Sequence, residues 1–208
     1  MVKTNSSSSR NEKLWRVISR LGRQSEKERS GRAQVRPGEE MIAITADTGM
    51  FFHILLKAIR AKHVLEVGTS AGFSTLWLAD AVGKNGRVVT IESDPSKIAR
   101  ARKNFQDVEV DKIIDVRHGV AVDVLRGLKG TKFDFALIDA DKENIARYFD
   151  LVLPLVRAGG IIAADNMLFP PAYRPTMKKY ARHVQGHPHV ESVTVPIGMG
   201  EEITIKLR

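Results

Sequence analysis

The chain contains no cysteine, which excludes disulfide bonds, thiol catalysis and zinc sites built on thiolates. No apolar run approaches the roughly 18 residues that a membrane-spanning helix needs. Aromatic residues make up only 6% of the 208 residues, too few for a surface that stacks several bases. The polar start MVKTNSSSSR lacks the apolar stretch of a secretory signal. These absences favour a cytoplasmic, globular protein of one domain with an appendage and no membrane partner.

Positive charge is concentrated at the N-terminus. Residues 1–36 hold ten basic and three acidic residues, whereas the remainder of the chain is nearly balanced and the whole chain has a net charge of +9. The sequence therefore predicts a basic N-terminal arm over residues 1–36 and a main domain over residues 37–208. We expect the arm to be disordered over residues 1–10, which are polar and rich in serine. We expect it to be helical over residues 11–24, where Leu14, Val17, Ile18 and Leu21 share one face.

Helical and strand-like segments alternate from about residue 42 onwards. The last two strands are separated only by residues 196–201, a linker too short for a parallel crossover, so they form an antiparallel hairpin. The predicted strands cover residues 63–67, 87–91, 113–117, 133–138, 161–164, 190–195 and 202–207. This order predicts an α/β fold with a doubly wound, mostly parallel, seven-stranded sheet and a C-terminal antiparallel hairpin.

The turns after the first two strands carry candidate ligand-binding residues, because open α/β sheets bind ligands at the carboxyl ends of their strands. Gly68 and Gly72 are four residues apart, which departs from G-x-G-x-x-G and disfavours a pyrophosphate cradle. Glu66 lies inside an apolar strand and needs a partner there, either a donor-rich ligand or a local lysine. Glu92 follows the second strand at a spacing suited to accepting both ribose hydroxyls of a nucleoside. Asp94 is better placed to cap the next helix.

Oxygen-bearing side chains also follow the fourth and fifth predicted strands. Asp139, Asp141 and Lys142 follow the fourth strand, and Asp165 and Asn166 follow the fifth. Carboxylate and amide oxygens from neighbouring strand ends suit Mg²⁺ or Ca²⁺ and do not suit zinc. The alternative is a surface loop with an Asp141–Lys142 salt bridge and an ordinary Asp-Asn turn.

Five stretches together resemble one enzyme family: LEVGTSAGFSTLWLA, GRVVTIESDP, FDFALIDADKEN, GGIIAADN and PIGMGEEITIKL. They are similar to the metal-dependent class I S-adenosylmethionine O-methyltransferases, which include catechol and caffeoyl-CoA O-methyltransferases. The resemblance covers about residues 41–208. It implies a Rossmann-like class I methyltransferase fold, S-adenosyl-L-methionine as cofactor and a homodimer. It also implies a divalent metal, magnesium in the first place, with calcium or manganese as alternatives.

The resemblance also implies roles for individual residues of this chain. The implied cofactor-binding residues are Glu66, Gly68, Ser74, Glu92, Ala121, Asp139 and Asp141, and residues 41–47 close over the cofactor. The implied metal ligands are Asp139, Asp165 and Asn166. The implied catalytic residues are Lys142, as general base, and Asp139.

The implied reaction is methyl transfer to a hydroxyl of a small catechol-like or other vicinal dihydroxy substrate. Phe169 stands close to where relatives carry a tryptophan and is a candidate wall for a planar substrate. A second hypothesis is an RNA or protein methyltransferase whose basic arm binds phosphates. A third is that residues 1–36 bind a protein partner or form the dimer, independently of the chemistry.

Overall fold

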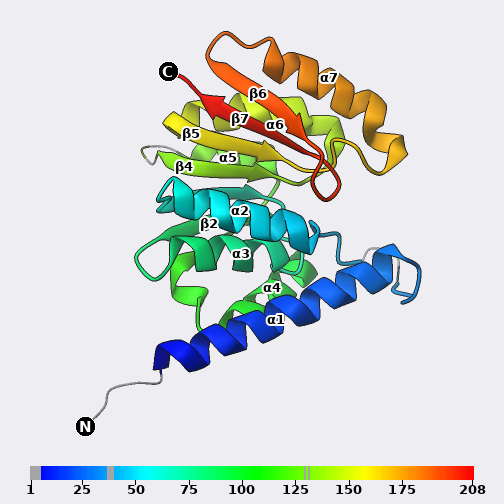
Figure 1. Cartoon of the computed structure of the whole chain (residues 1–208), viewed down its shortest axis with the longest axis vertical. Helices are drawn as coiled ribbons and strands as arrows, with labels where there is room; N and C mark the ends of the chain where they lie inside the picture. The colour runs from blue at the N-terminus through cyan, green and yellow to red at the C-terminus, as the bar shows by residue number, and fades with distance from the viewer. Residues whose placement is uncertain (1–5, 37–39, 129, 131) are drawn as a thin grey trace.

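The computed structural model describes residues 6–36, 40–128, 130 and 132–208, and it contains one seven-stranded sheet in the order β3-β2-β1-β4-β5-β7-β6 (Figure 1). The strands are β1 (His63–Val67), β2 (Arg87–Glu92), β3 (Ile114–His118), β4 (Phe133–Ile138), β5 (Val156–Ala164), β6 (Val190–Val195) and β7 (Glu201–Lys206). Strands β1 to β5 pair in parallel, and β7 runs antiparallel to both β5 and β6. The predicted doubly wound sheet with its C-terminal hairpin is confirmed.

Helices cover both faces of the sheet (Figure 1). One face carries α1 (Ser6–Arg29), α2 (Ala46–Ala58), α3 (Phe73–Val82) and α4 (Pro95–Asp107), and the other carries α5 (Ala121–Gly127), α6 (Ile145–Val152) and α7 (Arg174–Gln185). Short 3₁₀ turns are η1 (Asp111–Ile113), η2 (Lys142–Asn144), η3 (Leu153–Leu155) and η4 (Pro171–Tyr173). Within the described part of the chain, no helix is long and apolar enough to cross a membrane.

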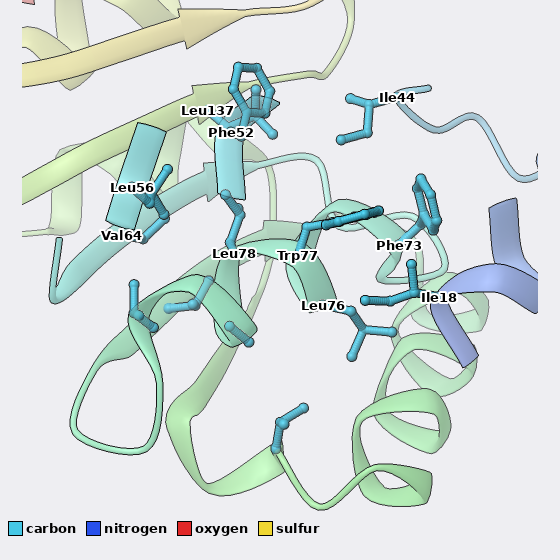
Figure 2. Packing of buried hydrophobic residues seen from close by; sticks show 14 of the residues in the cluster. Ile18, Ile44, Phe52, Leu56, Val64, Phe73, Leu76, Trp77, Leu78 and Leu137 are labelled. Atoms are coloured by element: carbon cyan, nitrogen blue, oxygen red, sulfur yellow. The ribbon is translucent and has the colours of Figure 1, made fainter. Parts of the chain in front are cut away.

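Alternate strand residues supply two separate cores, because successive side chains of a strand point to opposite faces. Val64 belongs to the core under α2 and α3, and its neighbour Leu65 belongs to the core under α6 and α7. Figure 2 shows Phe73 and Trp77 of α3 side by side, close to Ile18 of α1, in the first core. Burial on both faces holds the strands in register and fixes where their carboxyl ends lie.

Helix α1 begins earlier than the sequence predicted. We expected disorder over residues 1–10, but the backbone is helical from Ser6, and residues 1–5 lie outside the described residues. Leu14, Ile18 and Leu21 are buried in the same core as α2 and α3. A helix docked in this way extends through polar residues at little cost, because each added residue completes a backbone hydrogen bond.

Strand β5 also begins earlier than predicted, at Val156 instead of residue 161. Gly159 and Gly160 were interpreted as the end of a helix, but both lie within the strand. The pairing of β5 with β4 shifts register between Phe133 and Phe135. A Cβ at position 160 would lie 3.0 Å from the carbonyl oxygen of Asp134 and 2.6 Å from Val156 Cγ1, so the glycine permits this close pairing.

The docking of α1 can be tested by replacing Ile18, which is 3% exposed, with alanine. We expect the free energy of unfolding to fall by about 2–4 kcal/mol, because the substitution leaves a cavity in the shared core. Urea unfolding followed by circular dichroism measures the change. Ser19→Ala, an exposed neighbour on the same helix, is the control and should change stability little. An equally small loss for Ile18→Ala would contradict the docked position of α1.

Candidate active site

The carboxyl ends of β1 and β4 approach each other closely. Gly68, which follows β1, has a φ of +106°, and a Cβ there would lie 2.1 Å from the carbonyl oxygen of Asp139, which follows β4. Any other residue would push the two strand ends apart. Gly72 (φ +84°) then begins α3, and its missing side chain leaves room for Phe105. The predicted glycine turn is therefore a point of close backbone approach.

Glu66 lies in the centre of the sheet and is fully buried. Its Oε2 accepts hydrogen bonds from Thr75 Oγ1 at 2.5 Å and Thr90 Oγ1 at 2.6 Å, while its Oε1 has no partner. Burial raises the pKa of Glu66 to about 7, and the hydroxyl hydrogen bonds only partly offset this effect. The predicted partner was a ligand or a lysine, but the structure supplies hydroxyl groups.

Glu92 joins the loops that follow β1 and β2. Its carboxylate accepts hydrogen bonds from the backbone N–H groups of Ser70 (2.9 Å), Ser93 (2.9 Å) and Asp94 (3.1 Å). The predicted helix-capping role of Asp94 is confirmed, because its side chain accepts from Ser96 N at 2.7 Å. Glu92 is half-buried at the carboxyl edge of the sheet, where the sequence placed a ribose-binding acid.

Ser74 and Ala121 each lie in the first turn of a helix at this edge. Ser74 is buried in the first turn of α3, near the carboxyl group of Glu66, and contributes to lowering its pKa against the larger effect of burial. Ala121 is the first residue of α5 and is half-buried behind the exposed Val120. A small side chain at Ala121 leaves the backbone open to a flat ring.

Asp141 caps the 3₁₀ turn η2. Its carboxylate accepts from the backbone N–H of Asn144 at 3.2 Å and from the hydroxyl of Tyr148. Partial burial opposes the charged form, but the hydrogen bonds from Tyr148 and Asn144 prevail and lower the pKa of Asp141. Asp141 is therefore a negative charge on the rim of the site.

Lys142 forms an ion pair with Asp139 and not with Asp141. The distance between Lys142 Nζ and Asp139 Oδ1 is 3.0 Å, and each side chain is only 8% exposed. The alternative of a solvated surface loop with an Asp141–Lys142 pair is therefore wrong. The structure places one amine and one carboxylate together in a shielded position.

Asp165 and Asn166 follow β5 beside this ion pair. Asp165 is 1% exposed; burial raises its pKa, and the negative charge of Asp139 raises it further, so the two carboxyl groups are close neighbours. Asn166 adopts a left-handed φ of 71°. Its Nδ2 contacts Met199 Sδ at 3.0 Å, which orients the amide. The structure thus brings the residues Asp139, Lys142, Asp165 and Asn166 close together.

The donor set fits a hard divalent cation. Asp165 Oδ1 is buried without a donor, and the mutual repulsion of Asp139 and Asp165 would be relieved by positive charge. Among the described residues, no three side chains of His, Asp and Glu are arranged to hold a metal ion. That finding is compatible with a set that offers two carboxylates and one amide.

A further acid at this site, Glu201, was not among the residues predicted from the sequence. Glu201 is the first residue of β7, is fully buried, and lies next to Asp165. Burial raises its pKa strongly, and the charge of Asp165 adds to the effect. The sequence did contain a signal for a buried acid, because Glu201 and Glu202 are adjacent at the start of a strand. Successive side chains point to opposite faces of a sheet, and both faces of this sheet are covered, so each of the two acids faces a covered side.

The described residues also line a hollow of about 350 Å³ at the other end of β1 and β2. His63, Arg87 and Arg117 contribute to its wall, and Arg87 and Arg117 are already paired with Asp115 at 3.0 and 2.8 Å. We do not place the active site there, because it lies away from the carboxyl ends of β1 and β2.

Comparisons with known proteins identify one family. The sequence profile of the O-methyltransferase family matches residues 25–207. The chain is 45% identical over 127 residues to a catechol O-methyltransferase of Mycobacterium tuberculosis, covering 61% of this chain and 58% of that protein. It is 33% identical over 181 residues to a caffeoyl-CoA O-methyltransferase of Mesembryanthemum crystallinum, covering 77% and 71%.

A solved structure extends the likeness to the whole fold. The O-methyltransferase TomG from Streptomyces achromogenes, in complex with SAM, superposes with a TM-score of 0.78 at 25% identity. The match covers 100% of this chain and 92% of that one. The alignments with two catechol O-methyltransferases span only 58% and 61% of those proteins' lengths.

The buried carboxyl of Glu66 should leave a signature in the pH dependence of stability. Its pKa is raised from 4.5 to about 7 on folding, so its contribution is complete below about pH 4.5 and is lost as pH rises through 7. Glu66→Gln should remove this loss, which has a limiting slope of about 1.4 kcal/mol per pH unit. Urea unfolding at pH 5, 6, 7 and 8 measures the slope. Glu191→Gln on exposed β6 is the control, and an unchanged slope in Glu66→Gln would refute the assignment.

Proposed function

The chain belongs to the O-methyltransferase family, and from that premise we propose that it transfers a methyl group from S-adenosylmethionine to a hydroxyl of a small catechol-like or other vicinal dihydroxy substrate. One observation carries the proposal: the buried Asp139–Lys142 ion pair lies beside Asp165 and Asn166 at the carboxyl edge of the sheet. That edge is where open α/β sheets bind their ligands.

The cofactor would lie over the loops after β1, β2 and β3. The carboxylate of Glu92 already accepts hydrogen bonds from three backbone N–H groups, which fix its orientation. A carboxylate can accept about four hydrogen bonds in all. It therefore keeps capacity to accept a ribose hydroxyl. Gly68 allows a ligand to approach the backbone, and Asp141 places negative charge near a cationic amino group. Ala121 would flank the adenine.

Asp139, Asp165 and Asn166 would hold a divalent cation, with magnesium as the leading candidate. When bound, such an ion lowers the pKa of a coordinated hydroxyl and fixes its direction. The support is the unpartnered Asp165 oxygen and the amide of Asn166 held by Met199. Each ligand stands on a strand end and not on a free loop, which favours a precise geometry.

Lys142 would act as the general base. Its Nζ can accept the hydroxyl proton only as a neutral amine, so the Lys142 ammonium of the ion pair with Asp139 would first have to release a proton to solvent. The substrate oxygen then attacks the sulfonium methyl group, and the C–O bond forms as the C–S bond breaks. The products are a methyl ether and S-adenosylhomocysteine, with the proton on Lys142.

Apolar side chains next to the site favour a planar, aromatic substrate. Leu168 and Phe169 are 42% and 47% exposed. Their backbone N–H groups donate to the carbonyl oxygen of Met199 at 2.9 and 3.1 Å, which holds this segment beside Asn166. An exposed aromatic ring held in this way offers a face on which a catechol ring can stack.

The alternative of an RNA or protein methyltransferase finds less support. Basic residues of α1 make contacts within the chain: Lys13 pairs with Glu109 at 3.2 Å, and Arg20 donates to Asn104 at 2.8 Å. These contacts attach α1 to the domain and engage charges that phosphates would need. A homodimer remains part of our proposal, with no further nucleic-acid or membrane partner.

Asp139→Ala tests the proposed chemistry. We expect methyl transfer to catechol, in the presence of Mg²⁺, to fall roughly 100-fold or more, because the variant loses a metal ligand and the partner of Lys142. Binding of S-adenosylhomocysteine, measured by calorimetry, should be largely retained. Asp123→Ala, on the exposed side of α5, is the matched control. Full activity in Asp139→Ala would defeat the proposed role.

Phe169→Ala tests the proposed substrate wall. We expect the KM for catechol to rise about tenfold, equivalent to about 1.4 kcal/mol of lost stacking, with a smaller change in kcat. The melting temperature should stay nearly constant, because Phe169 is 47% exposed. Val193→Ala, also exposed but on β6, is the control. An unaltered KM would show that the ring does not contact the substrate.

A further inference from the structure

Glu201 is a fully buried acid that the proposed reaction does not use. Strand β7 runs antiparallel to β5 with Glu202 opposite Ala164, so the next pair of residues, Glu201 and Asp165, lie side by side at the carboxyl edge of the sheet. The carboxyl groups of Glu201 and Asp165 are near enough to interact electrostatically. Glu201 is thus a direct neighbour of Asp165, which is a proposed metal ligand.

The other oxygen contact of Glu201 leads to helix α2. Thr48 Oγ1 donates to Glu201 Oε1 at 3.0 Å, and Thr48 is itself fully buried in the first turn of α2. Thr45, the N-cap of α2, lies 3.1 Å from Thr48 through their hydroxyl groups. A Cβ on Gly198 would lie 2.1 Å from Thr48 Oγ1, so the loop before β7 is pressed against this turn.

The contrast with Glu202 shows that the position of Glu201 is unusual. Glu202 is also buried, but it lies on the opposite side of β7, where it accepts from Gln185 at 2.9 Å, from Ser192 at 2.6 Å and from Thr194. Glu201 Oε2 and Asp165 Oδ1, in contrast, are buried without a donor. A buried carboxyl group that lacks hydrogen-bond donors destabilises the fold. A role for Glu201 in holding Asp165 would account for a buried acid at position 201.

We propose that Glu201 is a positioning residue that ties Asp165, at the end of β5, to Thr48, in the first turn of α2. The inference rests on the proposed function, in which Asp165 holds a divalent cation, and on the implied closure over the cofactor of residues 41–47, which run into the first turn of α2. The tie fixes the carboxylate of Asp165 in the orientation that the cation needs. It also keeps the cation site and the start of α2 in one rigid arrangement.

Two substitutions of Glu201 distinguish a role that depends on hydrogen bonding from one that depends on negative charge. Glutamine can still accept from Thr48 through its amide oxygen and donate to Asp165 through its amide nitrogen. Alanine can do neither. We expect Glu201→Ala to weaken Mn²⁺ binding to the full chain about 10–100-fold, the usual cost of losing a residue that orients a metal ligand. Glu201→Gln should stay within about threefold of the unsubstituted protein, and calorimetry with Mn²⁺ measures both.

A third substitution approaches the tie from the other end. Thr48→Val keeps the size of the side chain but removes the hydroxyl donor, and it should weaken Mn²⁺ binding several-fold, although Thr48 offers no ligand to the cation. The double variant Thr48→Val/Glu201→Ala should bind Mn²⁺ no more weakly than Glu201→Ala alone, because both changes break one connection. Glu202→Gln is the matched control and should leave Mn²⁺ affinity unchanged.

The outcomes are distinguishable. Normal Mn²⁺ affinity in Glu201→Ala overturns the inference, as does a Glu201→Gln variant that loses as much affinity as Glu201→Ala, because charge and not hydrogen bonding would then be required. If Glu201→Ala does not fold, Thr48→Val and Glu201→Gln still decide the matter. If the unsubstituted protein fails to bind Mn²⁺, the metal part of the proposed function is wrong and the inference falls with it.

Discussion

The site depends on two acidic side chains, Asp139 and Asp165, that the fold holds next to each other in a buried position. Like charges at close range resist ionisation together, and a single ammonium group, Lys142, faces them. The arrangement is unfavourable for folding by itself. Positive charge would relieve this repulsion, which is why we propose that the site takes a cation.

The sheet makes this arrangement unavoidable. Strands β4 and β5 are buried on both faces and pair in parallel, so residues 139 and 165 emerge at the same edge. Gly68 lets β1 approach the carbonyl oxygen of Asp139, and Glu92 binds the two neighbouring loops through backbone N–H groups. The proposed chemistry and the proposed cofactor-binding residues therefore share one edge of the sheet, in keeping with the general use of strand ends in α/β proteins.

Much of the fold and the site could be predicted from sequence, because strand alternation fixes which edge the polar residues share. The pairing of Lys142 with Asp139 instead of Asp141 could not, since it depends on the turn η2. The start of β5 was misplaced because paired glycines mark helix ends as well as bulges. The position of Glu201 beside Asp165 was not predicted, because its contact with Thr48 and its proximity to Asp165 join elements far apart in the chain.

The most direct test of the central claim is methyl transfer by the unsubstituted protein, stripped of metal by a chelator and then reconstituted with Mg²⁺. With labelled S-adenosylmethionine and catechol, the account predicts no methyl ether above background in the stripped protein. It predicts full recovery of the product on addition of Mg²⁺. Equal product formation in the presence of excess chelator would contradict it.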